Sequence, residues 1–376
     1  PHNKMNLYNM QELLELNSII NDNSLPIEER AEALMDRVDL KIEEDDLPGA
    51  LQDLNMAICM NPNNPRAFML RGNAKYEFGD LDGALQDFSA AIELAPNVSS
   101  GYSLRAALKG EMEDFEGCRS DFDMAIKLCP FEPTLYQARG VARKNLEDWD
   151  GALADFTKAI RMNPKDTNSL LQRAHVKMET NDHKGALKDL ETVLRYDRSN
   201  AIVFSMRAKL RIPFGNTKGA IEDCSAAIRL EPTNAMYYQQ RAVAYTLNLD
   251  FAKAMNDYDT AITMSPEDPL HWEMRGTLKS TRGDDEGAIA DYTELINLSP
   301  DNSWGYYGRA KSMMMLDRTE ESMPDFNKAI ELDPENAEYI YRRGEAKFKL
   351  GDKEGAQADY DKAVELDDTF AELPYK

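Results

Sequence analysis

The side chains that most often perform catalysis or bind metals are few in this chain of 376 residues and lie far apart. They are the histidines His2, His175, His183 and His271 and the cysteines Cys59, Cys118, Cys129 and Cys224. A metal centre or a nucleophilic site needs several such groups at one point, and nothing in their spacing clusters them. A phosphate-binding glycine loop and a nucleophile elbow are also missing from the sequence. We therefore expect no enzymatic activity, no metal and no cofactor.

Two charged residue types recur at a fixed interval of 34 residues, and each aspartate follows its arginine by 16 residues. The arginines are Arg37, Arg71, Arg105, Arg139, Arg173, Arg207, Arg241, Arg275, Arg309 and Arg343. The aspartates are Asp53, Asp87, Asp121, Asp155, Asp189, Asp223, Asp257, Asp291, Asp325 and Asp359. Because a guanidinium and a carboxylate can form two parallel hydrogen bonds, we interpret the two sets as a structural ladder. The alternative is that the arginines line a groove and bind acidic ligands.

The elements that must position these charges follow the same period over residues 31–370. We number the positions of each 34-residue unit as columns 1 to 34, with Ala31 in column 1 of the first unit. Columns 8, 20 and 27 hold mostly small residues, whereas column 24 holds mostly bulky ones. Spacings of three and four residues between the apolar columns are typical of helices and not of strands. The small residues allow two helices to approach closely, so each unit is predicted to be a helix pair.

The ends of the two predicted helices are marked in most units. Column 16 is aspartate in eight of ten units, with Asn216 and Arg318 in the others, which is typical of a helix N-cap. Prolines near the end of most units stop the second helix. Two prolines interrupt the pattern: we expect Pro213 to shorten the first helix of its unit, and Pro324 to remove a hydrogen bond from the second helix of its unit.

The stretch that shows the column pattern most clearly, residues 342–367, reads RRGEAKFKLGDKEGAQADYDKAVELD. It resembles the tetratricopeptide repeat (TPR) family, and the likeness recurs in ten units. The resemblance implies an all-α fold, an α-solenoid in which antiparallel helix pairs form a right-handed TPR superhelix. It also implies that the first helix of each pair lines a concave groove. The arrays of this class bury their core only by stacking neighbouring units.

The predicted organisation has three parts. Residues 1–30 form an N-terminal capping helix and linker, with an amphipathic helix at 5–21 whose apolar residues include Leu7, Met10, Leu13, Leu14 and Ile20. Ten units follow, at 31–64, 65–98, 99–132, 133–166, 167–200, 201–234, 235–268, 269–302, 303–336 and 337–370. Residues 371–376 form a short C-terminal tail. The second helix of the last unit should expose apolar surface, which suggests either a longer natural chain or a homodimer through this C-terminal edge.

The columns expected to line the groove (2, 5, 9, 12 and 13) vary from unit to unit, so this is where we expect a partner to bind. Many of them carry apolar or aromatic side chains, which serve as binding anchors when exposed. The candidate groove residues are Tyr76, Leu171, His175, Ile202, Met236, Trp304, Tyr307, Met314, Met315, Tyr341 and Phe348. The alternative is that they pack on the neighbouring helices and are half-buried.

These features predict a non-enzymatic scaffold that binds a peptide or a partner protein in the groove. The alternative is a structural or oligomerisation arm of a larger assembly or of a multidomain enzyme. A net charge of −23 disfavours nucleic acid as a partner. The sequence contains no run of 18 apolar residues, so we expect no membrane insertion. Four thiols without a pairing pattern favour a reducing compartment and hence the cytoplasm, or the periplasm or exterior if a leader has been removed.

Overall fold

The computed structural model describes residues 7–372 and 375, and this part of the chain is helical throughout, without a strand. His2 and the first two residues of the predicted N-terminal helix lie outside the described residues. The α-helices are α1 (Leu7–Asn21), α2 (Ile27–Glu43), α3 (Leu47–Met60), α4 (Pro65–Glu77), α5 (Leu81–Leu94), α6 (Ser99–Glu111), α7 (Phe115–Leu128), α8 (Pro133–Asn145), α9 (Trp149–Met162), α10 (Thr167–Glu179), α11 (His183–Tyr196), α12 (Ala201–Arg211), α13 (Thr217–Leu230), α14 (Ala235–Leu247), α15 (Phe251–Met264), α16 (Pro269–Thr281), α17 (Asp285–Leu298), α18 (Ser303–Met315), α19 (Thr319–Leu332), α20 (Ala337–Lys349) and α21 (Lys353–Leu366). A short 3₁₀-helix, η1 (Asp368–Glu372), follows.

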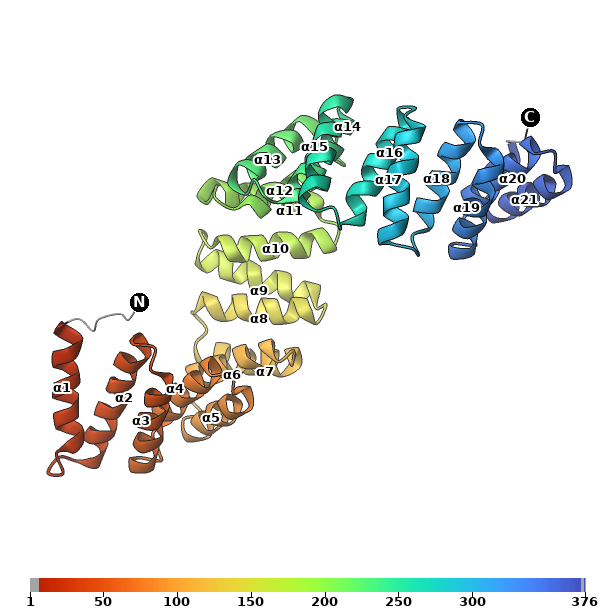
Figure 1. Cartoon of the computed structure of the whole chain (residues 1–376). Coiled ribbons are helices and arrows are strands. Elements are labelled where there is room, and N and C mark those ends of the chain that lie inside the picture. The colour runs from red at the N-terminus through yellow and green to blue at the C-terminus, as the bar shows by residue number, and fades with distance from the viewer. Residues whose placement is uncertain (1–6, 373–374, 376) are drawn as a thin grey trace. The chain divides into compact units, whose positions relative to one another are not determined.

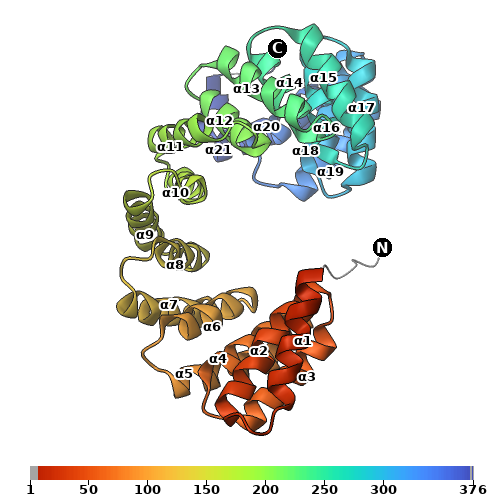
Figure 2. The same ribbon diagram turned by 90° about the vertical axis from the view of Figure 1, so that its left-hand side faces the viewer.

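From α2 onward the helices pack in consecutive pairs, α2 with α3 and so on to α20 with α21. The chain divides into two compact units, residues 1–196 with α1–α11 and residues 197–376 with α12–α21. Within each unit the pairs stack in chain order, as α1–α9 and α14–α21 show in Figures 1 and 2. The fold is therefore the all-α solenoid that the column pattern predicts. None of the helices in the described residues is both long and apolar enough to span a membrane.

In eight of the ten pairs the turn is fixed by the column-16 residue together with a glycine three residues later. In α5 the Asp80 carboxylate accepts a hydrogen bond of 2.9 Å from the Gly83 N–H. A Cβ atom at Gly83 would run into that carboxylate, which would have to shift, so glycine favours this close cap. Two second helices lack such a bond: α15 carries Lys253 in place of the glycine, and α19 follows Arg318, whose side chain cannot accept a hydrogen bond, and carries Glu321. The cap is thus a two-residue device, and column 16 alone does not make it.

The core of each pair is built from the small and bulky columns. Phe88 of α5 packs on Gly72 of α4, where an added Cβ would lie 2.6 Å from the ring. Phe156 and Gly140 repeat this contact between α9 and α8. The alanines of columns 8, 20 and 27 are almost all fully buried. These close approaches explain why residue size, more than sequence identity, recurs in these columns.

The two proline irregularities affect their helices differently. The helix α12 ends at Arg211 after 11 residues, two fewer than its equivalents α10 and α14, because Pro213 follows. This confirms the predicted shortening. Pro324 lies inside α19, which nevertheless continues to Leu332. The helix therefore accommodates the missing N–H without ending.

The N-terminal helix α1 packs against α2 with a face that includes only part of the predicted apolar residues. Leu16 and Ile20 are buried in a cluster with residues of α2, whereas Met10 and Leu14 are exposed. Of the apolar residues predicted for this helix, Ile20 is therefore buried, whereas Met10 and Leu14 do not belong to the packed face. The side chain of Leu7 lies outside the described ones. The buried positions lie on the face of α1 that meets α2, which the sequence of α1 alone did not identify.

At the other end the chain folds back on its last pair. Phe370 of η1 is buried, and its ring centroid lies 4.8 Å from that of Tyr341 in α20. The Tyr375 hydroxyl donates a hydrogen bond of 2.8 Å to the Tyr341 carbonyl, and the Tyr375 ring also contacts Phe348 and Tyr360. The chain itself therefore covers part of the apolar edge that we expected to be open. A homodimer through this edge stays a prediction.

Candidate functional site

Each of the ten column-7 arginines forms two parallel hydrogen bonds with the column-23 aspartate of the same pair. In the pair α4–α5, Arg71 Nε and Nη2 donate to the two carboxylate oxygens of Asp87 at 2.8 and 2.7 Å. The other nine pairs repeat this geometry, with distances between 2.5 and 2.9 Å. The aspartates are buried, none more than 8% exposed. The ladder therefore connects the two helices of each pair along the whole chain.

A second cation approaches most of these aspartates from the same first helix. In α4, Lys75 Nζ lies 2.9 Å from Asp87, and the basic residue of column 11 makes this contact in eight pairs. Tyr245 and Met313 occupy column 11 in the remaining two pairs. This column was not among the sequence predictions, although the recurrence of lysine or arginine four residues after the ladder arginine was a visible signal.

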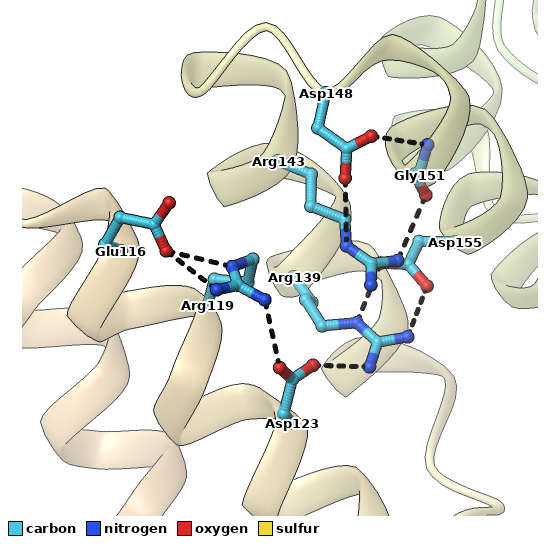
Figure 3. Close-up of polar contacts among 8 residues, drawn as sticks. All are labelled: Glu116, Arg119, Asp123, Arg139, Arg143, Asp148, Gly151 and Asp155. Atoms are coloured by element: carbon cyan, nitrogen blue, oxygen red, sulfur yellow. Dashed lines mark hydrogen bonds and ion pairs between the residues drawn. The ribbon is translucent and has the colours of Figure 1, made fainter.

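The third nitrogen of the arginine reaches back to the preceding pair. Figure 3 shows this for Arg139 of α8, whose Nη1 donates to Asp123 of α7 at 2.8 Å while Nε and Nη2 bind Asp155 of α9. Asp123 also contacts Arg119, and Arg143 contacts Asp155 from the other side. In seven other pairs the equivalent acceptor in column 25 is Asn55, Ser89, Thr157, Ser225, Asp259, Thr293 or Asn327. One arginine thus connects three helices.

Burial and hydrogen bonding act in opposite directions on these groups. Burial alone would raise the pKa of Asp121, but hydrogen bonds from Arg105 and Lys109 outweigh it and hold that pKa below its usual value. The hydrogen bond to Asp155 raises the pKa of Arg139 against the effect of its burial. Both groups are therefore charged at neutral pH. The donors of such arginines are engaged within the fold, which favours the structural reading of the ladder over ligand binding.

The aromatic residues of column 4 join the same framework. The guanidinium of Arg275 lies over the Trp272 ring at 5.2 Å, and four other ladder arginines lie over a column-4 ring in the same way. The Trp272 indole N–H donates to the Pro266 carbonyl of the preceding pair at 2.8 Å. Tyr136, Tyr238 and Tyr306 make the equivalent bond to a preceding proline. Column 4 is therefore part of the interface between pairs.

The predicted groove residues divide into three classes by exposure. Ile202, Met236, Trp304 and Met315 are exposed. Tyr76, Leu171, His175 and Phe348 are half-buried. Tyr307, Met314 and Tyr341 are buried. The expectation of an open position is therefore wrong for these last three.

Each of these three buried residues is covered by side chains from outside its own helix, so the sequence of that helix alone does not show that it is buried. The Tyr307 ring stacks on Tyr339 of the next pair with centroids 4.6 Å apart, and its hydroxyl donates to Glu338. Met314 packs in a cluster that includes Phe326 of α19 and Ala346 of α20. Tyr341 lies under Phe370 and Tyr375. These residues stabilise the stack instead of lining a surface.

Four exposed side chains occupy column 2 of four consecutive pairs, and we call them the column-2 stripe. They are Ile202, Met236, Leu270 and Trp304, with exposed fractions from 38% to 52%. Leu270 was not among the predicted groove residues, although it occupies the same column. In the first five pairs column 2 holds only polar residues: Glu32, Arg66, Ser100, Thr134 and Asn168. The apolar stripe therefore belongs to the second compact unit alone.

The first compact unit has a pocket instead, between α6, the start of α7 and α8. Its volume is about 380 Å³, and we call it the α6–α8 pocket. Its walls are mainly apolar, and Glu111, Gln137, Asn145 and Asn168 add polar groups. The lining residues were not among the sequence candidates, because alanine and glycine dominate the helix positions that open it.

The groups that could do chemistry remain apart in the structure. In the described part of the chain no three His, Cys, Asp or Glu side chains are close enough together to bind a metal. Burial raises the pKa of the Cys118 thiol to about 11 and that of Cys224 to about 12. Both thiols are therefore protonated at neutral pH and are poor nucleophiles.

Comparison with known proteins identifies the repeat. Models of the tetratricopeptide repeat match residues 35–99, 146–210, 305–336 and 337–370, which together make up just over half of the chain. None of the curated proteins matches it in sequence.

Two solved structures have a similar fold at low sequence identity. The C-terminal part of a TPR repeat-containing protein from Cytophaga hutchinsonii gives a TM-score of 0.54 at 17% identity, over 63% of this chain and 97% of the other. PilF from Pseudomonas aeruginosa gives 0.50 at 15% identity, over 56% and 96%. With its stacked helix pairs and these sequence matches, the chain belongs to the tetratricopeptide repeat family.

Proposed function

We propose that this protein is a non-enzymatic scaffold that binds a peptide, or a segment of a partner protein, on the exposed face of its first helices. The fold of the family suggests a role in protein–protein interaction. The observation that carries the finer proposal is the column-2 stripe, Ile202, Met236, Leu270 and Trp304.

Single exposed apolar residues are common on protein surfaces and need no explanation. The stripe differs from such single residues because column 2 is apolar and exposed in four consecutive pairs. Its four side chains therefore lie at equivalent positions on stacked helices. Repeated apolar exposure of this kind marks interaction sites. A partner would bury these side chains, and the hydrophobic gain scales with the area removed from water.

Trp304 is the strongest anchor in the stripe. Its ring centroid lies 5.4 Å from that of Tyr307, and its indole N–H points to Thr277 Oγ1 at 3.4 Å. Because these neighbours already fix the ring, little conformational entropy is lost on binding. Tryptophan is among the residues that most often dominate binding energy at interfaces.

The proposal is tested with peptides selected from a displayed random library on the full chain, and their affinity measured by fluorescence anisotropy. We expect Leu270→Ser combined with Trp304→Ala to weaken binding at least about tenfold, the equivalent of 1.4 kcal/mol. The matched control is Met264→Ser combined with Leu298→Ala, because these two residues are similarly exposed at the ends of second helices. Equal binding by the stripe variant and the wild type, or selection of no peptide, would contradict the proposal.

A further inference from the structure

We infer that the α6–α8 pocket is a second binding site, which takes a bulky apolar side chain of a polypeptide segment with a lysine or arginine next to it. The inference rests on the proposed function only in that the ligand is a polypeptide. The site belongs to the first compact unit and shares no residue with the column-2 stripe. The two sites can therefore be tested separately.

The pocket exists because three small residues coincide. Ala107 and Gly110 of α6 and Ala138 of α8 line it. The same three columns hold larger side chains in α10, namely His175 in column 9, Met178 in column 12 and Gln172 in column 6. Side chains of that size on α6 and α8 would occupy the space.

The walls of the pocket are suited to an apolar group. Phe122, Cys118 and Ala142 are buried and line it, and Phe115 and Val141 add further apolar surface. An apolar cavity of about 150 Å³ is enough for a benzene ring. A pocket of about 380 Å³ therefore has room for an aromatic side chain together with part of a neighbouring residue.

The edge of the pocket carries a fixed negative charge. The Tyr76 hydroxyl lies 2.8 Å from both carboxylate oxygens of Glu111 and donates to them. This contact raises the pKa of Tyr76 and holds the carboxylate in place. Within the described part of the chain no lysine or arginine forms an ion pair with Glu111, so its charge is not neutralised by the fold.

The charges around the pocket favour a cationic ligand and disfavour an anionic one. Column 13 is glutamate in four of the five pairs of this unit, at Glu43, Glu77, Glu111 and Glu179. Basic side chains of the same helices are engaged elsewhere: Lys109 binds Asp121, and Lys144 donates to Gln172. A lysine or arginine on the ligand would meet Glu111, and acidic segments would be repelled.

The neutral polar groups of the rim complete the site. Gln137, Asn145 and Asn168 line the pocket from α8 and α10, and a carboxamide can both donate and accept hydrogen bonds. Such groups can pair with the backbone of a bound segment whatever its sequence. The apolar pocket and Glu111 therefore determine which side chains of the ligand the site selects.

The test uses the full chain and three fluorescein-labelled peptides of about ten residues, with identical glycine–serine flanks. Their central pairs are phenylalanine–arginine, phenylalanine–glutamate and alanine–arginine. We expect the phenylalanine–arginine peptide to bind at least about tenfold tighter than either of the others at low salt, a difference of 1.4 kcal/mol.

Two variants with matched controls locate the binding. Ala107 is exposed, so Ala107→Phe should fill the pocket without disturbing the core and abolish binding, whereas Ala107→Ser should leave it unchanged. Glu111→Gln should remove the preference for arginine over glutamate. Glu179→Gln, in the same column but outside the pocket, should preserve it. Circular dichroism and hydrogen exchange check that each variant is folded.

The inference is overturned if no peptide binds, or if Ala107→Phe binds the phenylalanine–arginine peptide as tightly as the wild type does. If phenylalanine–arginine and phenylalanine–glutamate bind equally and Ala107→Phe abolishes both, the charge selection is wrong while the scaffold function stands. If the column-2 stripe variant loses its selected peptide and the pocket peptides fail, only the pocket inference falls.

Discussion

Arg139 and Asp155 form a two-bond ion pair between α8 and α9, with Nε and Nη2 of the arginine 2.9 and 2.6 Å from the two carboxylate oxygens. The remaining nitrogen, Nη1, donates to Asp123 of the preceding pair. One side chain therefore fixes both the packing within a pair and the packing between pairs. In a solenoid, whose stability is roughly a sum of unit and interface terms, this contact contributes to both kinds of term.

Removing the charge of one ladder aspartate should loosen the array locally. Asp189 accepts from Arg173 at 2.9 and 2.7 Å and from Lys177 at 2.8 Å, so Asp189→Asn leaves two partly buried cations without their counter-charge. We expect a loss of about 2–4 kcal/mol in the free energy of unfolding. Urea unfolding measures the loss, and faster hydrogen exchange in α10 and α11 locates it.

The exposed Asp150 provides the control, because Asp150→Asn removes a charge without breaking a buried ion pair. Equal unfolding curves for the two variants would show that the ladder does not stabilise the stack.

Asp121 should make the stability of the protein depend on pH in the acid range. Its hydrogen bonds lower its pKa in the folded state below the ordinary 3.8. A group with a lowered folded pKa stabilises the fold at pH values above its unfolded pKa, and this contribution disappears as the pH falls through the folded pKa.

We therefore expect the wild type to lose more stability than Asp121→Asn between pH 5 and the acid limit of folding. Thermal unfolding at a series of pH values measures the two slopes. Parallel slopes for both proteins would contradict the prediction.

The role of the glycine in the cap can be tested because the effect of Gly83→Ala on stability should change sign when the capping carboxylate is removed. Gly83→Ala brings a Cβ against the Asp80 carboxylate and should weaken the cap, at a cost of about 1 kcal/mol. In the background Asp80→Ala the carboxylate is absent, and the same Gly83→Ala change should stabilise α5 by up to about 1 kcal/mol through helix propensity. Chemical unfolding of the four proteins gives both values. The same sign in both backgrounds would show that the cap does not require glycine.

The returning C-terminal segment should protect the last helix pair. Tyr375→Ala removes the ring that covers Tyr341, Phe348 and Tyr360, and we expect faster hydrogen exchange in α20 and α21 but not in α14 and α15. The local loss should be about 1–3 kcal/mol for a half-buried aromatic side chain. Phe131→Ala, which removes a ring that is almost fully exposed, is the control. Exchange that is as slow in Tyr375→Ala as in the wild type would mean that the segment does not hold the end of the stack.

Much of the fold follows from local rules that the sequence displays openly. Helices form where apolar residues are three and four apart, and they begin after a capping aspartate. Pro213 ended α12 where its fixed φ and missing N–H required it. These features depend on residues close in sequence, and that is why the 34-residue period was enough to predict them.

The candidate site was predicted less well, because exposure depends on side chains that lie one pair away. Tyr307 and Trp304 are three residues apart on α18, yet Tyr339 buries the first and nothing covers the second to the same degree. Within one unit both read as groove residues. Only the packing of the next pair distinguishes them.

The sequence by itself determined the helix pairs, the caps and the partners of the charged ladder, since each depends on spacing within 34 residues. The tertiary structure alone decided where open surface remains. The α6–α8 pocket arises where Ala107, Gly110 and Ala138 meet across two pairs, and Tyr375 covers an edge that its own short segment did not predict. Open surface is the space that neighbours fail to fill, so it is a property of the packed stack and not of any one helix.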